Sequence, residues 1–172
     1  MARVIIIDGY NVIYNWPELK SLSEISLEHA RESLIERLNG YARYTGHEVK
    51  LVFDGHLVKG GKGSKKRVGN LEIIFTKSGK TADEVIEKMI QKSHRETYVV
   101  TSDEVEQWVT FGRGAWRMTP QEFHHELKKT LDEMAGYYRE SVVSDRFLFY
   151  RLDSKIREIL ERWRRGKQPH DS

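Results

Sequence analysis

Four aspartates stand where short apolar segments of this 172-residue chain end or where a helix begins: Asp8, Asp54, Asp83 and Asp103. Asp8 and Asp54 each follow an apolar run and precede a glycine, and Asp103 follows another such run. Carboxylates that gather in one place repel one another unless a cation lies among them, and Mg²⁺ or Mn²⁺ is the usual choice for oxygen ligands. A metal held in this way can activate a water and stabilise a phosphate under attack.

Structural explanations compete with this interpretation. The two Asp-Gly pairs are also typical of turns at strand ends. Glu84 and Glu104 are each placed to complete a helix capping box, with Thr81 and Thr101, so we treat both as structural. Asp54 is the least favoured of the four aspartates as a direct metal ligand.

Other polar residues lie near the same positions. Asn11, three residues after Asp8, can orient a water or a phosphate through its amide. Ser102 offers a hydroxyl directly before Asp103, although helix capping explains it equally well. Arg113 lies between two glycines and either contacts a phosphate or belongs to a simple turn. Tyr10 is a candidate for contacting a ligand through its ring, but a tyrosine here is more often a wall residue.

Several chemistries are excluded by residue type. The chain has no cysteine, which excludes thiol nucleophiles, iron–sulfur sites and cysteine-based zinc sites. The Lys62 segment lacks the first glycine and the Ser/Thr of a P-loop. A haloacid-type phosphatase needs a second aspartate at position 10, where Tyr10 stands.

The net charge of +3 is unevenly distributed. Residues 59–67 contain five cations and no acid, and residues 145–172 contain eight cations and five acids, whereas the rest of the chain is acidic. Basic segments on an acidic body favour a polyanionic partner. The candidate residues for binding such a polyanion are Lys59, Lys62, Lys65, Lys66, Arg67 and Arg113.

The elements that must position these residues alternate between strand and helix. Apolar runs at residues 3–8, 49–54, 71–76 and 97–102 predict strands, and helical spacing predicts helices at 26–44, 82–92 and 104–111. A further helix is expected from a capping box at Thr119 to about residue 134. This alternation predicts an α/β fold with a mainly parallel sheet covered on both faces.

We expect one domain at residues 1–144, with a mobile basic loop at 59–70. A basic amphipathic helix and tail at 145–172 should pack on the same domain. No signal peptide or membrane-spanning run is found, so the expected location is the cytoplasm. The oligomeric state is open, and a monomer is favoured.

Five motifs, in this order, resemble the YacP-type NYN domain of the PIN-like nuclease superfamily. They are IIIDGYNVIY at 5–14, FDG at 53–55, KTADE at 80–84, TSDE at 101–104 and GRGAWRMTPQEF at 112–123. The resemblance covers nearly the whole chain. It implies a Rossmann-like sheet, acids gathered around a metal, and cleavage of RNA phosphodiester bonds. The best-known members look like ribosome-associated endoribonucleases that cut mRNA in the ribosomal A site.

By this resemblance, Asp8, Asp83 and Asp103 take the family's acidic positions, and Asn11 takes the asparagine of its name-giving motif. Asp54 lies in the matching FDG, where it either binds the metal or shapes the pocket. The expected activity is a Mg²⁺- or Mn²⁺-dependent endoribonuclease in which a metal-activated water attacks phosphorus in line. Two alternatives remain: a non-catalytic module that binds RNA or the ribosome, and a small-molecule phosphohydrolase.

Overall fold

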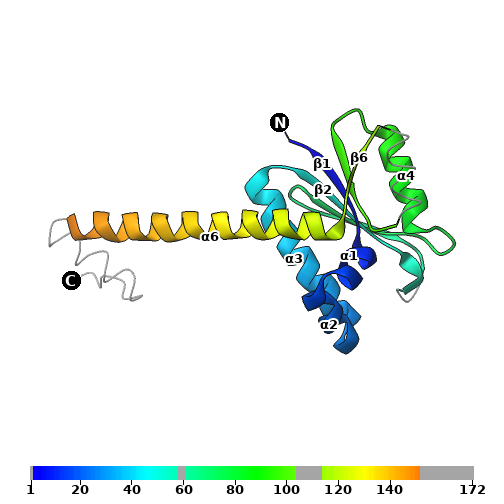
Figure 1. Ribbon diagram of the computed structural model, residues 1–172, viewed down its shortest axis with the longest axis horizontal. Coiled ribbons are helices and arrows are strands. Elements are labelled where there is room, and N and C mark those ends of the chain that lie inside the picture. Colours follow the sequence, from blue (N-terminus) through cyan, green and yellow to red (C-terminus); the bar gives the residue numbers. More distant parts are fainter. Residues whose placement is uncertain (1, 58–60, 104–113, 152–172) are drawn as a thin grey trace, which may run out of the picture. The chain divides into compact units, whose positions relative to one another are not determined.

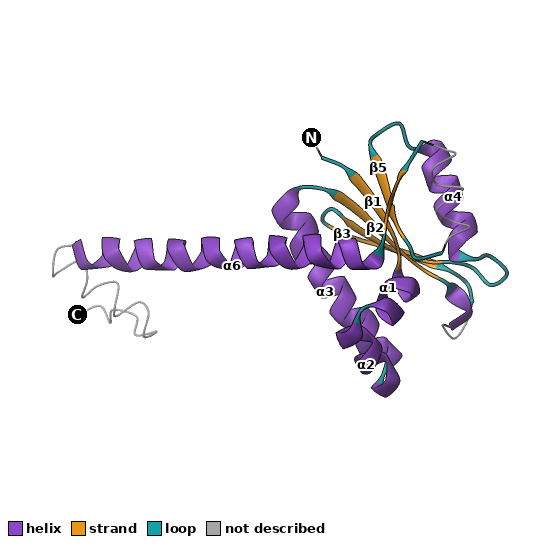
Figure 2. Ribbon diagram, viewed as in Figure 1, coloured by secondary structure: helices purple, strands orange, loops and turns teal. Residues whose placement is uncertain are grey.

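The computed structural model describes residues 2–57, 61–103 and 114–151 of the chain. Within this part lies a six-stranded sheet of order β3-β4-β2-β1-β5-β6, shown in Figures 1 and 2. The strands are β1 (Val4–Asp8), β2 (Glu48–Phe53), β3 (Ser64–Val68), β4 (Leu71–Phe75), β5 (Thr97–Val100) and β6 (Trp116–Met118). All neighbours pair in parallel except β3 and β4. The predicted α/β fold with a mainly parallel sheet is confirmed.

The central strand is apolar because both of its faces are covered. Ile5, Ile6 and Ile7 of β1 are at most 1% exposed, which is what a buried parallel strand requires. Their side chains alternate between two separate hydrophobic clusters, one on each face of the sheet.

Three helices between β1 and β2 cover the first face: α1 (Gly9–Asn15), α2 (Pro17–Ile25) and α3 (Leu27–Thr45). Trp16 and Tyr41 fill this core, and the first turns of α6 (Pro120–Arg151) add Phe123 and Leu127 to it. The helix predicted at 26–44 is confirmed as α3, with Ser26 as its N-cap. Neither α1 nor α2 was expected from the sequence.

A single described helix, α4 (Ala82–Lys92), covers part of the second face. Ile86 and Ile90 of α4 belong to the same cluster as Ile6 and Val99 of the sheet. Thr81 and Glu84 form the expected capping box at its start.

The basic segment at 59–70 was expected to be a mobile loop, and for residues 64–68 that expectation is wrong. These residues form the edge strand β3, which turns at Gly69 (φ 58°) and pairs with β4. Lys65 of β3 forms a 2.8 Å ion pair with Glu72 of β4, which adds to the pairing. Lysines are common on edge strands because they discourage pairing with other chains. Residues 58–60 lie outside the described part.

The helix expected to end near residue 134 instead continues through Gly136 to Arg151. One glycine in a helix interior costs only about 1 kcal/mol relative to alanine, so it does not have to end the helix. The chain divides into two compact units, residues 1–131 and 132–172, and α6 contributes to both. Of the predicted C-terminal segment 145–172, only the end of α6 is described, so its packing on the domain stays a prediction. No helix among the described residues is long and apolar enough to cross a membrane.

Candidate active site

The connections made by β1 and β5 lie on opposite faces of the sheet. The chain leaves β1 for helices on the first face, and it enters β5 from α4 on the opposite face. Because β1 and β5 are neighbours, a crevice is expected outside their carboxyl ends, where α/β sheets usually bind ligands. Asp8 is the last residue of β1, and Asp103 lies three residues beyond the end of β5.

The electrostatics of Asp8 show that the four aspartates lie near one another. Burial raises the pKa of Asp8 to about 6, and a hydrogen bond from the Asn11 backbone N–H lowers it. The charges of the three other aspartates, Asp83, Asp103 and Asp54, each raise the pKa further. The carboxylates that sequence reasoning placed at one edge therefore do lie within electrostatic range of one another, whereas their role as ligands stays a prediction.

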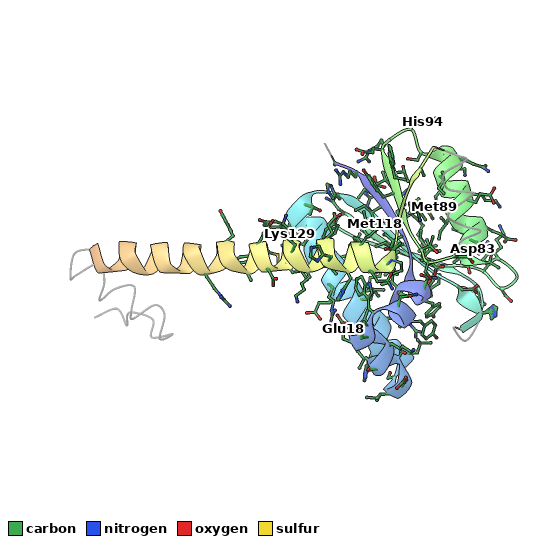
Figure 3. The ribbon with its side chains drawn as sticks, viewed as in Figure 1. Glu18, Asp83, Met89, His94, Met118 and Lys129 are labelled. Atoms are coloured by element: carbon green, nitrogen blue, oxygen red, sulfur yellow. The ribbon has the colours of Figure 1, made fainter. Side chains whose placement is uncertain are left out.

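Asp83 joins this group from the second face of the sheet. It lies in the first turn of α4, and Figure 3 labels it at the end of that helix nearer α1. Burial raises the pKa of its carboxyl, and the charges of Asp103, Asp54 and Glu84 raise it as well. A helix start thus brings an acid to an edge formed otherwise by strand ends.

Two of these acids, Asp8 and Asp83, are buried or half-buried carboxyls without a described cationic partner. Neither Asp8 nor Asp83 has a salt bridge to a described residue, and Asp54 pairs only with the exposed imidazole of His56, at 3.3 Å. An all-carboxylate donor set is suited to a hard divalent cation. However, no three described acidic or histidine side chains are close enough to hold one as they stand.

Asn11 links the segment after β1 to the segment after β5. Its side-chain amide donates to Ser102 Oγ at 2.9 Å, and the Ser102 backbone N–H donates back to Asn11 Oδ1 at 2.9 Å. Asn15, one turn later on α1, donates to the same hydroxyl at 3.3 Å. Asn11 therefore fixes the segment that carries Asp103, and its backbone N–H donates to Asp8 Oδ1 at 3.4 Å. Sequence reasoning missed Asn15, although its i, i+4 spacing from Asn11 was visible.

Close packing requires the glycine of each of the two Asp-Gly pairs. A Cβ on Gly55 would lie 1.7 Å from the carbonyl oxygen of Thr76, and one on Gly9 would lie 2.4 Å from the Phe53 ring. The Gly55 N–H also donates to Thr76 Oγ1 at 2.9 Å. Thr76 thereby ties the end of β2 to the end of β4, a role that no sequence pattern indicated.

The aromatic candidate Tyr10 is a wall residue. It is 7% exposed and packs on Phe53 with ring centroids 5.0 Å apart. Arg31 of α3 donates to its hydroxyl at 3.1 Å. Its ring is thus unavailable for stacking on a base in this conformation.

The candidate RNA-binding cations do not form one group. The register of β3 places Lys65 and Arg67 on the face covered by α4, opposite Ile74 and Glu72, and Lys66 on the other face. Lys62 is exposed just before β3. Lys59 and Arg113 lie outside the described residues.

Comparison with known proteins identifies one family throughout. A family model described as a YacP-like NYN domain matches residues 5–165. The chain is 39% identical over 166 residues to the Bacillus subtilis protein YacP, called uncharacterized, covering 95% of this chain and 97% of YacP.

Two solved structures of the same Bacillus subtilis protein, there called Rae1 (YacP), are also similar. One has a TM-score of 0.73 at 37% identity and covers 98% of both chains. The other, a tryptophan-to-leucine variant, has a TM-score of 0.69 at 33% identity and covers 92% of this chain and 98% of the variant.

Proposed function

This chain belongs to the YacP-like NYN domain family, and we propose that it is a metal-dependent endoribonuclease of the cytoplasm. The proposal rests on that membership and on the sheet edge that carries Asp8, Asp54, Asp83 and Asp103, here called the acidic edge. Membership in this family implies a nuclease-type PIN-like domain, with RNA as the substrate. The proposal goes further, to mRNA cleaved in association with the ribosome. The observation that carries it is the gathering of four aspartates at this edge: burial raises the pKa of Asp8 to about 6, and the charges of Asp83, Asp103 and Asp54 raise it further.

Each residue of the site has a distinct proposed role. Asp8, Asp83 and Asp103 would hold Mg²⁺ or Mn²⁺, with Asp54 as an outer member. When bound, such an ion lowers the pKa of a water and neutralises charge on a phosphate. Asn11 and Ser102 position the acids by joining the loops after β1 and β5.

One observation favours a second candidate, a non-catalytic module that binds RNA or the ribosome. In the described part of the chain no three potential ligands are close enough for a metal as they stand, and such a module has no need of one. A small-molecule phosphohydrolase is less favoured, since it has no need of the exposed cations on β3.

The test is cleavage of mRNA on translating ribosomes, compared with cleavage of the same RNA free in solution. Wild-type protein should cut the ribosome-bound message in Mg²⁺ and lose this activity in excess EDTA. The products should carry 5′-phosphate and 3′-hydroxyl ends.

Asp83→Asn should lower the cleavage rate by about 10²-fold or more, because it removes a charge from the metal's donor set. The matched control is Glu24→Gln, since Glu24 is an exposed acid of α2 distant from the acidic edge in sequence and fold. Full activity of wild type in EDTA, or of Asp83→Asn in Mg²⁺, would refute the proposal. RNA binding without any metal-dependent cutting would favour the non-catalytic module.

A further inference from the structure

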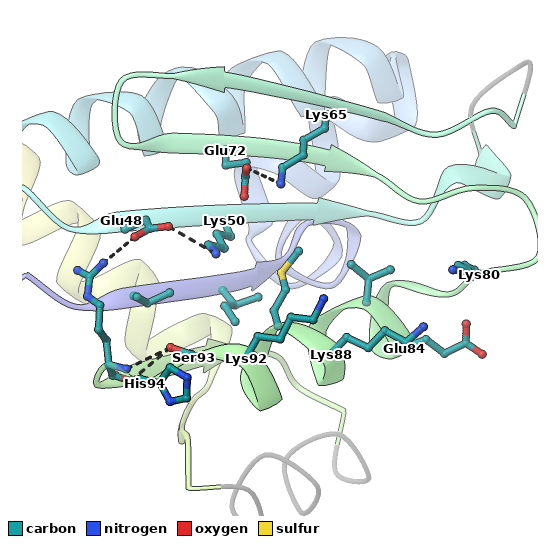
Figure 4. A pocket seen from close by; sticks show the side chains of 15 residues that line it. Glu48, Lys50, Lys65, Glu72, Lys80, Glu84, Lys88, Lys92, Ser93 and His94 are labelled. Atoms are coloured by element: carbon teal, nitrogen blue, oxygen red, sulfur yellow. Dashed lines mark hydrogen bonds and ion pairs between the residues drawn. The ribbon is translucent and has the colours of Figure 1, made fainter.

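In the described part of the chain, α4 is the only helix on the second face of the sheet. The chain passes from β2 to β4 through the short helix η1 (Gly55–Leu57) and the edge strand β3, so no helical crossover is formed there. On this face, β2, β4 and β3 carry charged side chains, among them Lys50, Glu72 and Lys65. Together with α4 it encloses a groove of about 570 Å³, shown in Figure 4.

The carboxylates of this groove are already engaged. Six lining side chains are cations, Lys50, Lys65, Lys80, Lys88, Lys92 and Arg95, and three are carboxylates, Glu48, Glu72 and Glu84. Glu48 pairs with Arg95 at 2.7 Å and with Lys50 at 3.5 Å. Glu72 pairs with Lys65, and Glu84 closes the capping box of α4.

Three lysines of the groove are left without an ion-pair partner among the described residues: Lys80, Lys88 and Lys92. Lys88 and Lys92 lie one turn apart on α4, and Figure 4 shows both among the side chains that line the groove. Four residues of helix rise by about 6 Å, which is comparable to the separation of successive phosphates in an extended strand.

A second hollow adjoins the first. It has a volume of about 350 Å³ and is lined by Lys62, Lys65, Lys77 and Lys80, with no carboxylate in its lining. The two hollows share Lys65, Lys80 and Val85. The row of lysines therefore continues from α4 toward the loop before β3.

This basic surface begins beside the acidic edge. Lys80 precedes the N-cap Thr81, and Asp83 lies in the following turn. In Figure 4 the arrowheads of β1 and β2 point toward the end of the groove where Lys80 lies. A strand with one phosphate at the acidic edge would therefore meet Lys80 first and then Lys88 and Lys92.

We propose that this lysine-lined groove binds the sugar–phosphate backbone of single-stranded RNA that extends from the acidic edge. The choice of RNA rests on the proposed function; the preference for a polyanion rests on the unpaired lysines alone. Lysines along a groove bind a backbone without regard to sequence, and a hollow of this size suits a single strand better than a duplex.

The test is the affinity of the full-length protein for a fluorescent single-stranded RNA, measured in EDTA over a range of salt concentrations. The double variant Lys88→Ala/Lys92→Ala should raise Kd about tenfold. It should also lower the slope of log Kd against log salt by about 1.4, because each of the two lost phosphate contacts contributes about 0.7. Because no cutting is needed, this result is independent of whether the acidic edge proves catalytic.

The control is Lys128→Ala/Lys129→Ala, which removes the same charge from exposed positions of α6 that line neither hollow. A second pair, Lys88→Gln/Lys92→Gln, keeps polar side chains of similar length and should give the same loss. Unchanged Kd and slope in both groove variants would overturn the proposal. So would displacement of the labelled RNA by polyglutamate of matched charge that is as strong as displacement by unlabelled RNA. The groove would then not distinguish RNA from an acidic protein segment.

Discussion

At the scale of single residues, Asp8 combines a capping hydrogen bond, burial and the charges of three neighbouring carboxylates. It ends β1, it caps α1 by accepting from the Asn11 N–H, and it is surrounded by three other carboxylates. Burial and these neighbours hold its pKa near 6, well above that of an unfolded chain. The residue is therefore a source of instability that the fold retains, as is common at functional sites.

The pH dependence of the free energy of unfolding should reveal the destabilisation caused by charged Asp8. The proton on Asp8 binds more tightly in the folded state, so its contribution to stability is fully present below about pH 3.8 and is lost as pH rises through about 6. In EDTA at pH 8, Asp8→Asn should therefore be more stable than wild type by on the order of 2 kcal/mol. Asparagine keeps the capping acceptor for the Asn11 N–H.

Denaturant unfolding of both proteins at pH 8 and pH 4 would check this, and the advantage of Asp8→Asn should vanish at pH 4. A variant less stable than wild type at both pH values would show that Asp8 is not electrostatically strained.

At the scale of elements, the sequence predicts the parts that are apolar and regular. The strands β1, β2, β4 and β5 and the helices α3 and α4 follow from apolar runs, helical spacing and caps. The elements α1, α2, β3 and β6 are short or carry polar residues, and tertiary packing or pairing with a neighbouring strand supports them.

The candidate site shows the same division. The positions of Asp8, Asp54, Asp83 and Asp103 follow from strand ends and a helix start, because parallel strands end at a common edge. The link between Asn11 and Ser102 spans 91 residues of sequence, so local patterns do not predict it. The groove beside α4 was equally unpredictable, since it depends on which strands lack a helix above them.

Gly55 provides a test of how tightly the end of β2 is held. Gly55→Ala should destabilise the protein by about 2–4 kcal/mol, because its Cβ would collide with the backbone of Thr76. Gly136→Ala is the matched control: nothing lies within 4 Å of its added Cβ, and alanine favours the helix. Thermal unfolding should show a lower Tm for the first and an equal or slightly higher Tm for the second; equal Tm values for Gly55→Ala and wild type would exclude the collision.

At the scale of the whole chain, the small net charge of +3 conceals two surfaces of opposite sign. Acids gather at the carboxyl edge of the sheet, and lysines line the groove between α4 and the sheet. The two surfaces meet at the start of α4, where Lys80 and Asp83 are three residues apart. A polyanion held by the lysines would be directed toward the acids, which repel it unless a cation neutralises them.

The central claim, that the acidic edge is a divalent-metal site, is tested most directly by binding of Mn²⁺ to the full-length protein at pH 7.5, followed by electron paramagnetic resonance. Wild type and Glu24→Gln should bind the ion with equal affinity, and Asp8→Asn should bind it at least about tenfold more weakly, since one carboxylate of the donor set is lost. Unchanged affinity in Asp8→Asn, or no binding by wild type, would contradict the account.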